Sequence, residues 1–146
     1  RSSDLSADVI PRISTYHGVT GLKTALSHIL SSTTELLLWT NQESERHFFA
    51  NPEHTAFVRD RIYENIPIRV LAVNNNAGKK LLKSDTSSLR TTKLLPDTIH
   101  FTAETYIFES KVVIIDFTAD IIAIVIENTS VHSAQAAQFE YTWSTL

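Results

Sequence analysis

The stretch YIFESKVVIID, residues 106–116, decides the fold of this chain. Two apolar runs, rich in the β-branched and aromatic residues that favour strands, flank the polar residues Glu109 and Lys111. A connection this short joins strands that pair antiparallel. The stretch therefore predicts a β-hairpin, with strands at about 105–108 and 111–117.

The rest of the second half has the same character. Residues 89–95 and 121–127 are predicted as further close-spaced strands with short connections, so we expect them to pair largely antiparallel as well. A final helix from Ser130 is expected to close the core with one face. The residues of that face follow helical spacing and are His132, Ala136, Phe139 and Trp143.

The first half alternates strands with helices. Residues 35–40 and 68–73 are unbroken apolar runs, the pattern of strands that are buried on both faces. An edge strand is expected at 9–13, because an edge position tolerates Pro11. We expect three helices in this half. The first covers about 20–32 and the third lies around Leu81 and Leu82. The second begins at the start signal Asn51, Pro52 and Glu53 and ends before Pro67. This order predicts an α/β fold with a mixed, mostly parallel sheet flanked by helices.

The composition fits one domain. The chain has 146 residues, 42% of them hydrophobic and 20% charged, which is enough to bury a single core. We expect residues 1–8 to be the remnant of a linker and residues 9–146 to be the domain. Because the chain contains no methionine, we expect it to be excised from a longer protein. The absence of cysteine excludes disulfides, thiolate zinc sites and cysteine nucleophiles.

Hydropathy and charge narrow the class of partner. The longest apolar runs, residues 36–39 and 121–126, are far shorter than the roughly 20 residues that a membrane span needs, so we expect a cytoplasmic protein without a membrane partner. A formal net charge of −3 and a pI near 6.1 lack the basic surplus of a self-sufficient nucleic-acid binder. Any DNA contact is therefore expected from another segment.

One spacing in the hairpin suggests chemistry. Glu109, Lys111 and Asp116 have the frame of the phospholipase D motif, His-x-Lys-x4-Asp, with glutamate in place of histidine. In that superfamily the histidine is the nucleophile and the lysine binds phosphate. Strand alternation would keep Glu109 and Lys111 on one face, but a carboxylate adds negative charge where an anionic phosphate must approach. We therefore expect no catalytic residue and no enzyme activity.

Two other patterns are weaker. Residues 74–80 resemble a phosphate loop, but Val73 occupies the first glycine position and Lys80 replaces the hydroxyl that would hold magnesium, so a plain turn into a helix is expected. His47 and His54 lack carboxylates at metal-binding spacing and are expected at the surface or at a helix end. We expect neither a metal nor a cofactor.

The residues that we expect to bind a ligand come from three places. Trp39 ends a buried strand next to Asn41, and ligands of α/β sheets gather beyond the carboxyl ends of parallel strands. Glu109 and Lys111 form a charged pair on an apolar hairpin. Removing these charges from water costs free energy unless they bind a ligand, stay exposed or pair with each other. We predict a ligand over this face, with Trp39, Asn41 and Asn128 as walls; a structural tryptophan and a surface Glu109–Lys111 contact are the alternatives.

Five segments together resemble the C-terminal domain of TrmB-type transcriptional regulators, in the order of that family. They are YHGVTGL (16–22), IPIRVL (66–71), YIFESKV (106–112), IEN (126–128) and FEYTW (139–143). The resemblance covers nearly the whole chain from about Val9. It implies a phospholipase D-like half-domain that follows a winged helix-turn-helix module, with an effector or dimerisation role in a repressor or activator.

The resemblance also implies partners. They are a second copy of the chain in a homodimer, a small-molecule effector, and DNA through the missing N-terminal winged helix-turn-helix alone. The longer, sugar-binding members continue beyond the family's final tryptophan, whereas this chain stops three residues after Trp143, so a sugar is not expected. The competing hypotheses are an active phospholipase D-like phosphodiesterase or nuclease, based on Lys111 and Asp116, and a purely structural interaction module.

Overall fold

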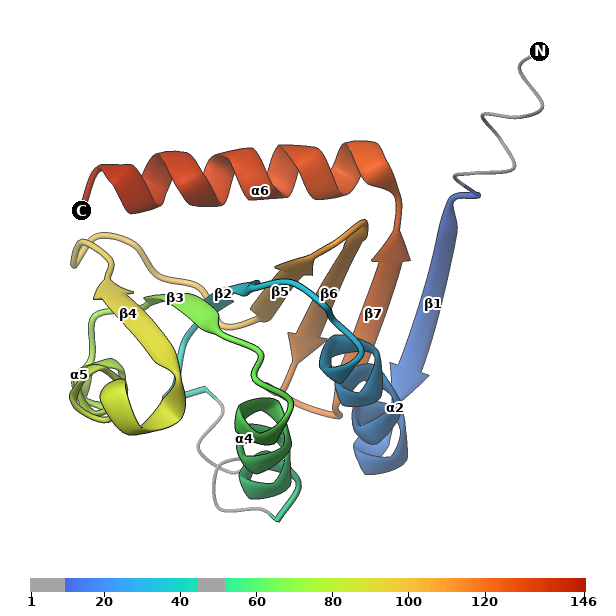
Figure 1. Ribbon diagram of the computed structural model, residues 1–146, viewed down its shortest axis with the longest axis horizontal. Helices are drawn as coiled ribbons and strands as arrows, with labels where there is room; N and C mark the ends of the chain where they lie inside the picture. Colours follow the sequence, from blue (N-terminus) through green and yellow to red (C-terminus); the bar gives the residue numbers. More distant parts are fainter. Residues whose placement is uncertain (1–9, 45–51) are drawn as a thin grey trace.

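The computed structural model describes residues 10–44 and 52–146 (Figure 1). Its strands are β1 (Arg12–His17), β2 (Leu36–Thr40), β3 (Ile68–Ala72), β4 (Arg90–Leu94), β5 (Glu104–Phe108), β6 (Lys111–Asp116) and β7 (Ile122–Glu127). Its helices are α2 (Gly18–Leu30), α4 (Pro52–Tyr63), α5 (Asn76–Lys83) and α6 (Thr129–Ser144), with a 3-10 turn, η1 (Thr86–Ser88). The predicted linker 1–8, Val9, His47 and the capping residue Asn51 lie outside the described residues.

The strands form one mixed sheet in the order β1-β7-β6-β5-β2-β3-β4. This confirms the predicted α/β class, but the expectation of a mostly parallel sheet is wrong. Only β2–β3 and β3–β4 are parallel, and the other four pairings among the described strands are antiparallel. The reason is that β2, β3 and β4 are neighbours joined by helical crossovers, while β5, β6 and β7 follow one another through turns too short for a parallel return.

The two faces of the sheet are covered unequally. In Figure 1, α6 lies along one face, and α2 and α4 lie against the other. Side chains of β2 alternate between the two cores: Leu36 and Leu38 pack with α2, whereas Leu37 and Trp39 pack with Phe139 of α6. Phe139 is the buried residue of α6, which confirms the face predicted for that helix, and its neighbours on that face are half-buried.

β1 is the edge strand that the sequence predicts, but it begins later and continues to His17. It then turns directly into α2 at Gly18, whose φ of 68° is the left-handed region that favours glycine. At Gly21 a Cβ would lie 2.8 Å from the carbonyl carbon of Tyr16, so this close approach of helix to strand requires glycine. Backbone geometry therefore explains why glycine stands at both positions of the segment 16–22.

Among residues 10–44 and 52–146, no helix has the length and apolar character needed to cross a membrane.

Candidate ligand site

The tip of the β5–β6 hairpin is a tight turn rather than a continuation of either strand. Glu109 has a left-handed backbone, with φ at 50°, and its carboxylate accepts a hydrogen bond of 2.8 Å from the backbone N–H of Thr33. The Thr33 hydroxyl also lies 3.5 Å from the same carboxylate oxygen. The expectation that Glu109 and Lys111 alternate along one strand is therefore wrong, because Glu109 lies in the turn and ties it to the α2–β2 loop.

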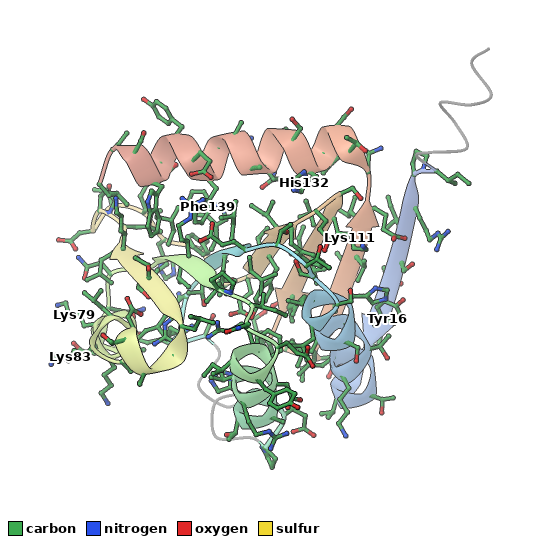
Figure 2. All side chains as sticks on the ribbon, viewed as in Figure 1. Tyr16, Lys79, Lys83, Lys111, His132 and Phe139 are labelled. Atoms are coloured by element: carbon green, nitrogen blue, oxygen red, sulfur yellow. The ribbon has the colours of Figure 1, made fainter. Side chains whose placement is uncertain are left out.

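Lys111 begins β6 and is half-buried (Figure 2). Its Nζ lies 5.7 Å from the centroid of the Phe108 ring, which is a cation–π distance. It pairs in register with Glu127, but the carboxylate of Glu127 forms its ion pair with Arg12 instead, at 3.5 Å. Within the described part of the chain the Lys111 ammonium has no ion pair and no hydrogen bond, so it remains available to an anion.

Asn128 connects the hairpin to α6. Its backbone N–H donates to the carbonyl of Ser110 at 3.0 Å, and its Oδ1 accepts from the backbone N–H of Val131 at 2.9 Å as the cap of α6. Glu109, Lys111 and Asn128 are thus brought together at one end of the sheet. Neither of the two clefts described below, one under α4 and one beside Trp39, is lined by any of them.

Asp116, the last residue of the motif frame, lies at the opposite end of β6 from Lys111. It accepts hydrogen bonds from the Thr118 hydroxyl at 2.6 Å and from the Thr118 backbone N–H at 2.9 Å. These bonds, the side-chain one first, lower the pKa of Asp116. The carboxylate is thereby committed to the turn after β6.

Trp39 and Asn41 are not walls of the Glu109–Lys111 region, which corrects that prediction. Trp39 pairs in register with Thr105, four residues before the hairpin tip, which corresponds to roughly 14 Å along a strand. Trp39 also faces α6, whereas Lys111 by strand alternation faces the α2 side. Figure 2 shows Lys111 well apart from Phe139, against which Trp39 packs.

Asn41 is 3% exposed and has a structural role. Its Nδ2 donates to the carbonyl of Phe101 at 2.8 Å, and its Oδ1 accepts from the Asn75 amide at 3.0 Å and from the Glu43 backbone at 3.1 Å. Trp39, in contrast, lines an open cleft of about 240 Å³ with Phe101, Ala103, Thr105 and Gln135. Of these two residues, which we predicted as walls of a ligand site, Trp39 therefore borders open space and Asn41 does not.

A third polar region lies under α4, and sequence reasoning missed it. A small cavity of about 50 Å³ is bordered by polar residues from α4, β4 and β5, among them His54, Arg61, Arg90 and Glu104. Glu104 is 2% exposed and accepts a hydrogen bond of 3.1 Å from the Thr40 hydroxyl. The predicted strand began one residue later, at 105, and so left out this buried carboxylate.

Burial lowers the pKa of two basic side chains around this cavity, those of His54 and Arg61. Burial first, and then the charge of Arg90, lower the pKa of His54 to about 4. Burial also lowers the pKa of Arg61 to about 10. The Arg61 guanidinium donates to the carbonyls of Ile66, Leu89 and Ser88 and so joins the loop before β3 to the segment before β4.

The remaining candidate patterns are structural. In segment 74–80, Asn75 caps α5 by accepting from the backbone N–H of Gly78 at 2.9 Å, as expected for a turn into a helix. His54 lies in the first turn of α4, at a helix end as predicted. Across residues 10–44 and 52–146, no group of three His, Asp or Glu side chains is arranged to hold a metal ion.

The matches to known proteins that we find are to solved structures. No protein-family model and no curated protein sequence matches the chain. Among solved structures, NucT from Helicobacter pylori superimposes with a TM-score of 0.67 at 10% identity, over 92% of this chain and 96% of NucT. A phospholipase D family member, Nuc from Salmonella typhimurium, gives 0.68 at 12% identity, over 92% and 95%. The fold is phospholipase D-like.

This likeness confirms one sequence expectation and overturns another. The phospholipase D-like domain is the architecture that the resemblance of the five segments implied. The expectation that the chain is not an enzyme is contradicted, because its fold is shared with members of a family that carries an enzyme's name. At 10–12% identity the likeness shows the fold alone.

Proposed function

We propose that this phospholipase D-like domain is the ligand-sensing and dimerising domain of a TrmB-type transcriptional regulator. In such a regulator a winged helix-turn-helix module outside this chain contacts DNA. The observation that carries the proposal is that four of the five resembling segments contact one another in two pairs. Arg69 of segment 66–71 binds Glu140 of segment 139–143, and Ser110 of segment 106–112 binds Asn128 of segment 126–128.

These pairings matter because each segment alone is short and weakly specific. Two contacts connect four of the segments, although the members of one pair lie about half the chain apart in sequence. In the fifth segment, Gly18 and Gly21 are required by the backbone. A shared set of residues that hold one architecture together supports a shared domain type better than matching composition would.

The charge distribution supports the division of labour within the regulator. The chain has 13 Lys and Arg against 16 Asp and Glu, which leaves no surplus for neutralising phosphates. Two of its arginines also form ion pairs within the chain: Arg69 with Glu35 and Glu140, and Arg90 with Asp85. DNA is therefore assigned to the separate module.

The outer edge of β1 is the surface that we assign to the dimer. Among the described strands β1 pairs with β7 alone, so its other side presents backbone groups that no described strand pairs, and Ile10 before it and Ile13 within it are 64% and 71% exposed. An antiparallel edge is complementary to its own copy, as a two-fold interface requires. Lys111 lies two strands from this edge, roughly 10 Å away, so two copies would bring their hairpins toward the same axis.

A second candidate is a phospholipase D-like phosphodiesterase. Two observations favour it: the fold likeness and the Lys111 ammonium, which has no counter-ion among the described residues. An unpaired cation at the start of a strand is suited to holding a phosphate. The two candidates differ in what the protein does with its ligand, and that difference can be measured.

The deciding experiment combines DNA binding with turnover. Fluorescence anisotropy on the promoter region of the parent gene should show specific binding by the full-length protein and none by residues 1–146 at physiological salt. Hydrolysis of bis(4-nitrophenyl) phosphate and of single-stranded DNA is assayed in parallel, with Lys111→Ala and the surface control Lys80→Ala. A parent protein without a DNA-binding module contradicts the regulator, and turnover that only Lys111→Ala abolishes establishes the phosphodiesterase.

A further inference from the structure

We propose that the cleft between the sheet and the middle of α6 binds a small, uncharged, flat ring compound of one or two rings. Trp39 and Thr105 line the cleft from the sheet, Phe101 and Ala103 from the loop before β5, and Gln135 from α6. Its volume of about 240 Å³ lies below the roughly 300–1,000 Å³ of pockets for drug-sized ligands. The site is separate from the hairpin that carries Lys111.

The aromatic walls are held in place before any ligand arrives. The Trp39 ring meets the buried Phe139 ring edge-on, with centroids 5.9 Å apart and an interplanar angle of 86°. The Phe101 ring stands at 78° to the indole, with centroids 6.2 Å apart. Two rings at nearly right angles form a corner in which a flat ring can stack on one and meet the edge of the other.

The loop that carries Phe101 is pinned to the end of β2. Asn41 donates to the Phe101 carbonyl and Ser44 donates to the Thr102 carbonyl, both at 2.8 Å. Asn41 is itself fixed by the Asn75 amide. Asn41 therefore acts as a positioning residue for the cleft, and the site is preformed on two of its three sides, as small-molecule sites usually are.

The polar groups at the cleft are neutral and unused. Among the described residues, the Trp39 indole N–H, the Thr105 hydroxyl and the Gln135 amide form no hydrogen bond with another protein group. No lining residue is charged. An ionised ligand would lose hydration there without gaining a counter-charge, whereas a neutral ring with a donor or acceptor at its edge would keep its hydrogen bonds.

Occupancy of the cleft would connect α6 to the sheet. Phe139 is the residue through which α6 is buried, and Gln135 lies one turn before it. A ligand between Gln135 and Trp39 would add an attachment nearer to the start of α6 than Phe139. This consequence rests on the proposed function, in which a bound effector must favour one arrangement of the domain. The proposed binding site does not depend on that function.

Protein-observed NMR on residues 1–146 tests the site. The probes are nicotinamide, indole, phenol and hypoxanthine, with nicotinate and benzoate as charged counterparts. We expect neutral probes to shift the Trp39 indole and Gln135 amide signals at millimolar concentration, and the charged counterparts not to. Neutral probes that leave both signals unchanged, or carboxylates that bind equally well, overturn the proposal.

Matched variants on α6 identify the contact. Loss of one hydrogen bond, about 1 kcal/mol, should make Gln135→Ala bind the best probe roughly fivefold more weakly. Gln138→Ala, on the exposed side of the same helix, should bind normally. Thr105→Val provides a second test that keeps the side-chain shape, and equal affinity in all three variants contradicts the assignment. DNA binding by the full-length protein is measured separately, so failure here leaves the proposed regulator role distinguishable.

Discussion

Arg69 and Glu140 form a bidentate ion pair that joins β3 to α6, with Nη1–Oε1 at 2.8 Å and Nη2–Oε2 at 2.6 Å. The guanidinium also lies 5.2 Å from the Trp143 ring centroid, and its Nε donates to Glu35 at 2.9 Å. A fork of this geometry is stronger than a single surface ion pair because both bonds are charge-assisted. The buried Phe139 ring, this ion-pair network and the hydrogen bond of 3.0 Å from Lys93 Nζ to the Trp143 carbonyl thus attach the C-terminal helix to the sheet.

Replacing Glu140 by glutamine should lower the free energy of unfolding by about 1 kcal/mol at pH 7 after allowance for its solvent exposure. The hydrogen bond from Arg69 lowers the pKa of Glu140 below its ordinary value of 4.5. Its contribution is therefore complete above that pH and is lost as the pH falls through the lowered pKa. Urea unfolding of both proteins between pH 7 and pH 2 should show the difference shrinking. The control Glu64→Gln, at an exposed residue that forms no ion pair with any other described residue, should show no such difference.

Stability should also fall with pH because of His54. Its pKa, about 4 in the folded protein against an ordinary 6.5, means that the unfolded chain binds the proton more readily between these values. Stability is complete above pH 6.5 and should drop by an amount on the order of 2 kcal/mol as the pH falls to about 4. The other ionisable groups that border the same cavity are Arg90, Arg61, Glu104 and Tyr106.

The variant His54→Gln should remove most of this loss between pH 6.5 and pH 4, while His17→Gln, at an exposed histidine of β1, should retain it. Chemical denaturation at half-unit pH intervals makes the comparison. An unchanged slope in His54→Gln would contradict the assignment to this residue.

The two glycines of segment 16–22 should respond differently to substitution. Gly21→Ala forces a methyl group to within 2.8 Å of the Tyr16 backbone and should destabilise by about 1–3 kcal/mol, the usual cost of overpacking. Gly18 has open space and needs only a left-handed backbone, so Gly18→Asn should cost under about 1 kcal/mol. Equal effects in thermal melts would be inconsistent with this local geometry.

The dimer surface can be located because the chain has no cysteine. Single substitutions Ser14→Cys and Thr15→Cys place one thiol on β1, and at least one should form an intermolecular disulfide under mild oxidation if two β1 edges pair. Thr91→Cys on β4, the opposite edge strand, is the control and should remain monomeric on a non-reducing gel. Light scattering on the unmodified chain should show a dimer; a monomer at high micromolar concentration would contradict dimerisation by this domain.

The sequence alone determined the elements. Apolar runs at 36–40 and 68–72 are buried strands, the hairpin around Glu109 forms, and the Phe139 face of the last helix packs on the sheet, because periodicity and β-propensity are local properties. What the sequence left open was the antiparallel pairing of β1 with β7, more than 100 residues apart, and of β2 with β5. Pairing partners are chosen by packing across the whole fold, and no local window contains that choice.

The candidate site divides in the same way. From the sequence, Trp39 could be placed at the end of a buried strand and Lys111 next to a turn, but not on opposite faces and at opposite ends of the sheet. Glu109 takes a left-handed conformation and binds Thr33, 76 residues away. The tertiary structure alone decided which of these residues meet, because a strand's register against its neighbours fixes both the face and the end at which each side chain lies.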